Sequence, residues 1–234
     1  MSLDADHSPI TDESSMLESL LNRRHSCRAF DDRPVPDDVI ERMFDLARRT
    51  ASWCNAQPWQ VIVTAGAGTD RFRTALTRKV AEGEGSYDIE PPTEYRGVYR
   101  ERRRSSGFAL YESLDIARDD RPRRIAQAME NYRFFGAPHV AIVTSPAELG
   151  PYGYIDCGGF IANLLLAAES LGLGIIAQGA IANYSNVVRD HFDIPADRRI
   201  VCGISFGYPD RDHPVNTFRT DRAPLSEMLD RVTD

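Results

Sequence analysis

Cysteine is scarce in this sequence, and its arrangement excludes a disulfide framework or a metal site. The four cysteines form no C-x-x-C pair, and their spacing to the five histidines matches no metal-ligand pattern. Three have an apolar neighbour on at least one side, as is typical of small, reduced core residues in a cytosolic protein. The four are Cys27, Cys54, Cys157 and Cys202.

Positive charge is in deficit, and long apolar runs are missing. The chain has 28 Lys and Arg against 35 Asp and Glu, a net charge of −7. Duplex nucleic acid is held by neutralising phosphates, so we expect no nucleic-acid partner. The polar, acidic start is unlike a secretory signal, and no apolar segment reaches membrane-spanning length. We therefore expect a soluble, cytoplasmic protein without a membrane partner. The basic run 100–106 is expected to be a solvated face, because acidic residues follow it.

Several common catalytic and nucleotide-binding motifs are also missing. No G-x-G-x-x-G follows the first expected strand, and the sequence has no Walker loop, H-E-x-x-H or G-x-S-x-G. These absences disfavour a stand-alone dinucleotide fold and a serine hydrolase.

The remaining composition is that of a globular domain. With 234 residues, 42% hydrophobic and 27% charged, the chain can form one domain with a substantial core. We expect a disordered tail at 1–15, a single domain at 16–234, and an excursion or lid at about 84–121, where Pro, Gly and charge are frequent. Periodicity predicts helices at 15–24, 34–51, 69–82, 122–135, 154–172, 186–195 and 224–232, and strands at 59–65, 138–145, 174–178 and 199–209. Their order predicts an α+β or α/β sandwich.

The segment 154–174 stands out because it is apolar on nearly all faces. A helix of that kind is buried on all sides, in a large core or in a subunit interface.

Basic residues gather in "RRHSCRAF" near the N-terminus. Two arginines and a hydroxyl within a few positions suit an anion such as a phosphomonoester, which arginine binds in bidentate fashion. A solvated basic loop is the alternative. Two further arginines precede the last expected helix and could join the same anion or lie on the surface. The candidates are Arg24, His25, Ser26, Arg28, Arg219 and Arg222.

Two polar stretches at strand ends could face a flat ligand. In "SWCNAQPW" the amides offer donors and acceptors suited to the edge of a ring system, although they could instead cap a helix with both tryptophans in the core. For Trp59 we favour the core. In "AQGAIA" a glycine at a strand end would let backbone approach a ligand closely, and a plain turn is the alternative. The candidates are Ser52, Trp53, Asn55, Gln57, Gln178, Gly179 and Ala180.

Taken together, the ordered motifs resemble the FMN-dependent nitroreductase family. They are "RRHSCRAF", "SWCNAQPW", "NYRFFGAPHVAIV", "DCGGFIANLLLAAESLGLG", "AQGAIA" and "FGYPDRDHPVNTFRTDR", and they span the chain from about Leu17. The excursion resembles that of nitrobenzoate-type reductases. The resemblance implies an α+β, three-layer sandwich in which helices flank a central mixed sheet. It also implies an intertwined homodimer with two FMN sites at the subunit interface and the apolar helix 154–172 at the dimer core.

The resemblance also implies roles for individual residues. Arg24, Ser26, Arg28 and Arg222, with His25 beside them, would hold the FMN phosphate, and Arg219 fits less securely. Ser52, Trp53 and Asn55, with Gln57 nearby, would come from the partner subunit. Gln178, Gly179 and Ala180 would lie along the flavin ring. Ala51 stands where family members often have proline, a change in backbone stiffness.

The implied activity is reduction of nitroaromatic or quinone-like acceptors by NADPH or NADH, with ping-pong kinetics and no catalytic side chain or metal, since the flavin carries the chemistry. Other reactions on the same scaffold remain open: reductive dehalogenation, denitration, enone reduction or flavin fragmentation. A non-catalytic FMN-binding protein and a flavin-free phosphate-binding regulatory module are the alternatives from other classes.

Overall fold

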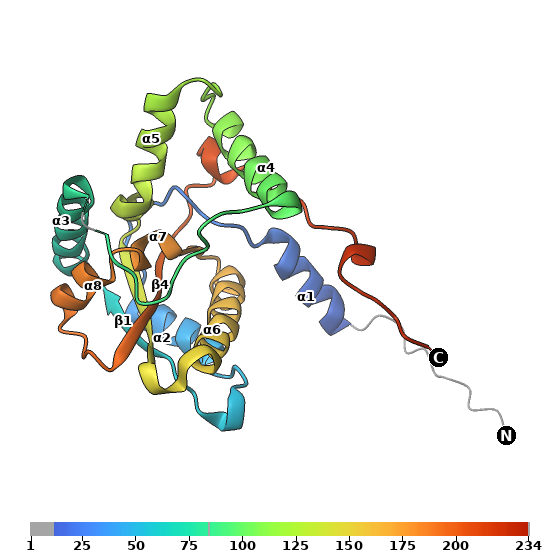
Figure 1. Cartoon of the computed structure of the whole chain (residues 1–234), viewed down its shortest axis with the longest axis horizontal. Helices are drawn as coiled ribbons and strands as arrows, with labels where there is room; N and C mark the ends of the chain where they lie inside the picture. The colour runs from blue at the N-terminus through green and yellow to red at the C-terminus, as the bar shows by residue number, and fades with distance from the viewer. Residues whose placement is uncertain (1–11, 84, 234) are drawn as a thin grey trace.

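The computed structural model describes residues 12–83 and 85–233, and it places a four-stranded sheet between two layers of helices (Figure 1). The strands are β1 (Gln60–Thr64), β2 (His139–Pro146), β3 (Gly174–Gln178) and β4 (Arg198–Gly207), in the order β1-β2-β4-β3. We expected a mixed sheet, but these strands pair antiparallel throughout. In the described residues, parallel contact occurs only as isolated bridges, such as Ser26 to Ile175. Helices cover both faces, so the strands read as continuous apolar runs from which strand direction cannot be inferred.

Eight α-helices are present in the described residues. They are α1 (Asp12–Arg23), α2 (Asp37–Ala47), α3 (Ala67–Glu82), α4 (Gly97–Ser113), α5 (Arg121–Met129), α6 (Gly150–Ser170), α7 (Gly179–Ala182) and α8 (Ser185–Phe192). The predicted helices near 15–24, 34–51, 69–82, 154–172 and 186–195 are therefore confirmed, as are the four strands. Within the described residues, no helix has the length and apolar character that a membrane crossing requires.

The two cores lie on opposite faces of the sheet because side chains alternate along each strand. Ala141 and Val143 of β2 face a core made with α2 and α6. Val140 and Ile142 face a second core made with α3 and α8. All four side chains are buried.

Helix α6 buries only one side within a single chain. Its buried side includes Phe160 and Leu164, whereas Ile155 is 67% exposed. Gly159 and Ala162 share the exposed side with Ile155. Exposed apolar stripes of this kind are typical of contact surfaces, and burial of this stripe in a subunit interface stays a prediction.

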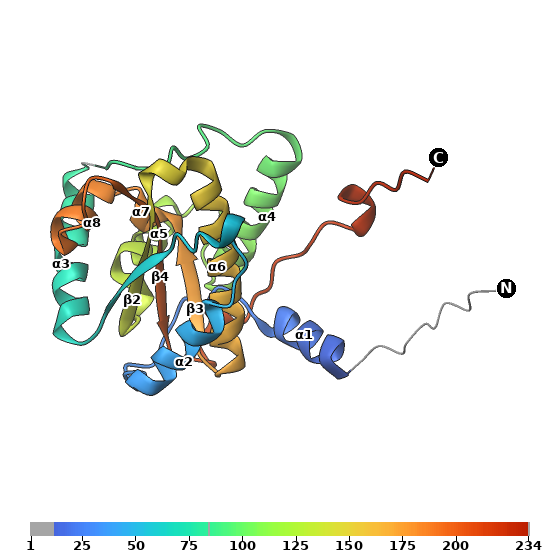
Figure 2. The same cartoon turned by 90° about the horizontal axis from the view of Figure 1, so that it is seen from below.

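The predicted helix at 224–232 is wrong. The C-terminal segment runs away from the body in both views and forms only a short 3-10 turn at Leu225–Glu227 (Figures 1 and 2). Leu225 and Met228 are exposed, so the segment has no surface to pack on. A nine-residue helix is marginal in water without such packing.

Near the N-terminus, helix α1 begins at Asp12, so the last four residues of the expected tail are helical. Residues 1–11 of that tail lie outside the described residues. The expected excursion contains a regular element, α4, that stands beside the body (Figure 2). Its base is fixed to the fold by Asp88, whose carboxylate pairs with Arg189 and accepts a hydrogen bond from Ile200 N at 2.8 Å.

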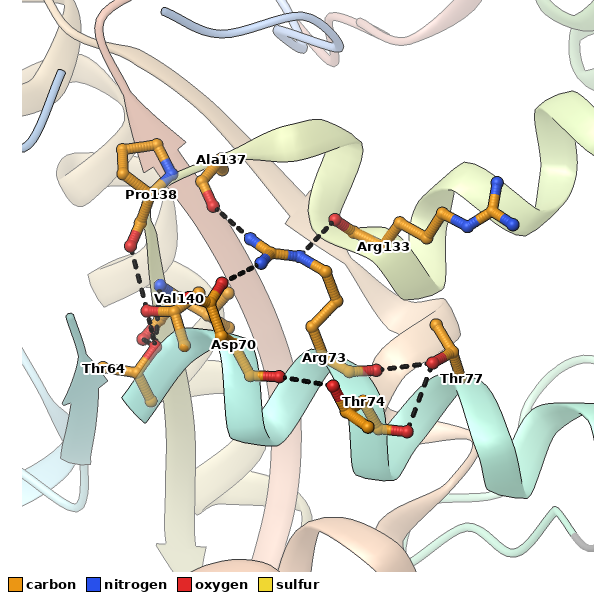
Figure 3. A network of polar contacts seen from close by, with 10 residues as sticks. Thr64, Asp70, Arg73, Thr74, Thr77, Arg133, Ala137, Pro138 and Val140 are labelled. Atoms are coloured by element: carbon orange, nitrogen blue, oxygen red, sulfur yellow. Dashed lines mark hydrogen bonds and ion pairs between the residues drawn. The ribbon is translucent and has the colours of Figure 1, made fainter. Parts of the chain in front are cut away.

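The helix expected at 122–135 splits into α5 and a 3-10 segment, Glu130–Gly136 (η2), with left-handed backbone at Phe134 and Phe135. Arg73 of α3 holds this unusual turn by donating to the carbonyl oxygens of Arg133, at 3.1 Å, and Ala137, at 2.9 Å (Figure 3). Asp70 pairs with the same guanidinium. This support fixes the position of Phe135, which contacts the candidate site described below.

His139 is a buried structural histidine. Its Nε2 accepts from Val35 N at 2.9 Å and its Nδ1 donates to Thr64 O at 3.1 Å, so the neutral ring satisfies both partners. Burial lowers the pKa of His139, which means that the fold favours the neutral form.

We therefore expect stability to be complete above about pH 6.5, the ordinary histidine pKa, and to fall as the pH drops below it. A histidine of this kind changes the free energy of unfolding by at most about 1.4 kcal/mol per pH unit. Urea unfolding between pH 5 and 8 measures this dependence. H139Q, which does not titrate, should flatten the acid side, and an unchanged slope would contradict the assignment.

Candidate functional site

A basic pocket of about 390 Å³ opens between the segment after α1, the start of the C-terminal arm (217–233) and one face of α4. It brings together all six basic-site candidates of the sequence: Arg24, His25, Ser26, Arg28, Arg219 and Arg222. Ser106 of α4 and Phe218 also line the pocket, as do Leu21, Asn22 and Thr220, and nothing in their local sequence indicated this.

The four arginines of this pocket have no carboxylate partner among residues 12–83 and 85–233. Within the described residues, the guanidinium groups of Arg28, Arg219 and Arg222 donate only to carbonyl and hydroxyl oxygens close in sequence. Unpaired cations at this density repel one another, and an anion relieves that repulsion.

The pKa values of two pocket arginines are lowered by burial and, for Arg24, by a neighbouring positive charge. Burial lowers the pKa of Arg28, whose guanidinium carbon lies 5.9 Å from the ring centroid of Phe135 and 5.5 Å from that of Phe218. Burial, and then the charge of Arg222, lower the pKa of Arg24. The pocket therefore favours a multiply charged anion, and arginine forks match the geometry of phosphate.

The segment that carries the pocket is fixed by two residues that the sequence analysis did not single out as holding it, Cys27 and Asn216. Cys27 is fully buried, and its N–H donates to Ile175 O of β3 at 3.1 Å. Asn216 accepts from Arg28 N at 2.8 Å and donates to the carbonyls of Ala29 and Asp210. This buried amide ties the N-terminal half of the pocket to the C-terminal half.

His25 borders the pocket in an unsatisfied state. Its Nδ1 donates to Arg23 O at 3.1 Å, whereas its buried Nε2 has no partner in the described part of the chain. Burial lowers the pKa of His25, opposed by the bond to Arg23 and assisted by Arg219.

The polar loop 52–57 has a strained backbone. Cys54, Asn55 and Gln57 all have left-handed φ angles, of 49°, 57° and 47°. Such conformations cost about 1–3 kcal/mol each and gather at functional sites.

Contacts within the loop and to α6 hold it in place. Asp156 of α6 accepts from Trp53 N at 3.1 Å, and Ser52 Oγ accepts from Gln57 N at 3.0 Å. Asn55 keeps an exposed side-chain amide.

The two tryptophans have different surroundings, one in the core and one at the surface. Trp59 stacks on the buried Phe160, with ring centroids 5.1 Å apart, which confirms the expected core role. Trp53 is 63% exposed and leans on Tyr152, also exposed. A large uncovered aromatic pair at this loop is available to a partner or ligand.

Gln178 differs from the simplest expectation. Its side chain is buried, donates to Asn131 O at 2.8 Å and accepts from Ser205 Oγ. The amide therefore makes hydrogen bonds within the fold, and a contact of Gln178 with a ring system stays a prediction. The open side of this turn lies at Gly179, which is exposed and has no atom near the position of a Cβ.

The loop 52–57 and the basic pocket lie at opposite ends of α6. The loop is tied to Asp156, and Glu169 pairs at 3.1 Å with Arg23, the residue directly before the pocket residue Arg24. Thirteen residues separate these anchors, which is about 20 Å along a helix. One chain therefore does not bring the two groups of candidates together.

Comparison with known proteins identifies the chain. The model described as "Nitroreductase family" matches residues 21–208. The chain belongs to the nitroreductase family.

Relatives in this family are similar over nearly their whole length. Nitroreductase NfnB of Mycolicibacterium smegmatis is 36% identical over 94% of both chains. The 4-nitrobenzoate reductase of a Nocardioides species is 36% identical, with 93% of this chain and 90% of that protein covered.

A solved structure of the FMN-dependent nitroreductase NfnB from Mycobacterium smegmatis, in complex with NADPH, superposes with a TM-score of 0.90 at 34% identity. It covers 95% of this chain and 100% of the other. The predicted nitroreductase-like α+β fold is confirmed.

Proposed function

We propose that this nitroreductase family member is an FMN-dependent NAD(P)H oxidoreductase that reduces nitroaromatic or quinone-like acceptors. The observation that carries the proposal is the pocket with four arginines and no carboxylate among the described residues. Its charge and donor set fit the phosphate of FMN. The similarity to NfnB, solved with NADPH, and to a 4-nitrobenzoate reductase supports the donor and the acceptor class.

In this proposal the chain binds and orients the cofactor. Arg24, Arg28 and Arg222 hold the phosphate, with Ser26, His25 and Arg219 at its edge. Backbone N–H groups at Gly179 and Ala180, together with the residue 178 backbone, lie along the ring and stabilise negative charge there. FMN supplies hydride and electron transfer when it is bound. We assign no side chain as general acid.

A homodimer brings the two ends of α6 together. In a twofold contact the same surface of each copy meets its counterpart. If the exposed stripe Ile155, Gly159, Ala162 packs against itself in antiparallel fashion, the Asp156 end of one helix lies beside the Glu169 end of the other. Ser52, Trp53, Asn55 and Gln57 of one subunit then reach the basic pocket of its partner. We place FMN at this interface, and the protein in the cytoplasm.

An absorbance spectrum of the purified protein, followed anaerobically with NADPH and then NADH, tests the proposal. We expect flavin bands that bleach with the donor and recover when a nitroaromatic is added. Retained FMN that neither donor reduces would indicate a non-catalytic flavin-binding protein. A colourless protein that cannot be reconstituted with FMN would overturn the proposal.

The Asn55 side chain can be tested separately from its backbone. At φ 57° an alanine is strained but a glycine is not, so N55G removes the amide without adding strain. If the amide contacts the flavin, both N55A and N55G should retain FMN roughly 10-fold less well, the effect of one lost hydrogen bond. Flavin fluorescence during dilution measures retention. Wild-type retention in N55G would assign the role to the backbone alone.

A further inference from the structure

Three consecutive residues of η2 have left-handed backbone. Phe134, Phe135 and Gly136 have φ angles of 62°, 53° and 78°. Glycine adopts this conformation readily, but in a residue with a side chain the Cβ comes too close to the following carbonyl oxygen. Two adjacent phenylalanines therefore do not favour this turn by themselves, and contacts from outside it have to stabilise it.

Arg73 of α3 makes those contacts at both ends of the turn (Figure 3). It donates to Arg133 O at 3.1 Å and to Ala137 O at 2.9 Å, the carbonyl oxygens directly before and directly after the three left-handed residues. Asp70 pairs with the same guanidinium and so orients it. The planar fork of an arginine can join two carbonyl oxygens in this way, and the flexible ammonium of a lysine does so less well.

The middle residue of the turn connects it to the basic pocket. The guanidinium carbon of Arg28 lies 5.9 Å from the ring centroid of Phe135, which is buried. Arg28, Phe135 and Gly136 also line a separate cavity of about 550 Å³. This cavity gives the ring room to move if the turn relaxes, and Arg28 would then lose one of its two aromatic neighbours.

We propose that Arg73 is a positioning residue for the FMN phosphate. Arg73 holds the left-handed turn, the turn holds Phe135, and Phe135 keeps the guanidinium of Arg28 in place at the basic pocket. The inference rests on the proposed function, because it takes Arg28 to bind the phosphate. Arg73 is not among the described residues that line the basic pocket, so its effect has to pass through the turn.

The test compares full-length R73M with the wild type, each loaded with FMN or with riboflavin, which lacks the phosphate. Flavin fluorescence during dilution gives the affinity for each. Methionine keeps an apolar contact with Phe134, whose ring centroid lies 5.5 Å from the guanidinium carbon, and removes both contacts to the carbonyls. We expect FMN to bind about 10-fold more weakly, as for one lost charge-assisted hydrogen bond, and riboflavin to bind as in the wild type.

Two further variants serve as controls. R73K should lie between R73M and the wild type, since lysine keeps the charge and loses the fork. R78M removes an exposed arginine of the same helix and should change neither affinity. Equal losses for FMN and riboflavin in R73M would show that Arg73 stabilises the fold alone, and would overturn the inference.

A double-mutant cycle tests whether Arg73 acts through Arg28. In R28M the contact with the phosphate is already lost, so R28M/R73M should bind FMN nearly as R28M does. A further loss of about 10-fold in the double variant would mean that the two residues act independently, and the inference would be wrong.

Failure of the proposed function gives a different result, because the wild type itself would then bind FMN no better than riboflavin, or bind neither. Hydrogen exchange of the Ala137 N–H, which donates to Phe134 O at 3.0 Å, still reports on the turn in that case. We expect faster exchange in R73M than in the wild type. Equally slow exchange would show that Arg73 does not hold the turn, and would overturn the inference whether or not flavin binds.

Discussion

Replacing Arg28 with methionine should weaken FMN binding by about 10- to 100-fold, the value of a charged hydrogen bond to phosphate. Methionine keeps much of the length and the apolar contact with Phe135 and Phe218 but removes the charge. Arg28 is a partly buried cation without a carboxylate partner in the described residues. Its removal should leave the flavin-free protein as stable as before, or more stable. FMN binding therefore falls without a loss of stability.

Titration of flavin-free protein with FMN and with riboflavin, which lacks the phosphate, separates the two roles. Arg28 should matter for FMN and little for riboflavin. R121M, an exposed arginine on α5, controls for the loss of one charge. A lower melting temperature for R28M with equal losses for both ligands would instead assign Arg28 to packing, and our reading of the pocket would then be wrong.

The sequence predicted those parts of the fold whose information is local. Periodicity predicted helix α2, and an apolar run predicted strand β2. The structure has both elements at the predicted places. The basic candidates were found because arginines cluster in two short segments. That these segments form one pocket depends on Asn216, a buried amide with contacts distant in sequence. A single asparagine has no pattern that would reveal this.

Other features depended on what each segment packs against. The segment 224–232 has helical periodicity, but its apolar side chains find no surface within the chain. Helix α4 was not predicted, because Pro, Gly and charged residues are frequent around it. None of its residues is buried, so it has no apolar face to give a helical period. Gln178 suited a ligand edge by chemistry, yet Asn131 and Ser205 use its amide. In each case the local sequence left the outcome open, and tertiary contacts decided it.

A substitution in the exposed stripe of α6 should have the second large effect. It should abolish FMN binding although the changed side chain does not contact FMN. Ala162 is exposed and lies near the midpoint between the loop anchor Asp156 and the pocket anchor Glu169. In the proposed antiparallel contact it faces its own copy across the twofold axis. A162E then buries two like charges together, at a cost of several kcal/mol. We expect a folded monomer that retains almost no FMN.

Sedimentation and flavin absorbance, measured on the same preparation, test this directly. A81E makes the same substitution at an exposed position on α3, in the other helical layer, and should leave both mass and flavin content unchanged. If A162E remains a dimer with full flavin content, the α6 stripe is not the contact. If it becomes a monomer that still binds FMN tightly, one chain completes the site, and the 20 Å between loop and pocket must close within that chain. Loss of the dimer and of FMN together is the result that a site shared between two subunits requires.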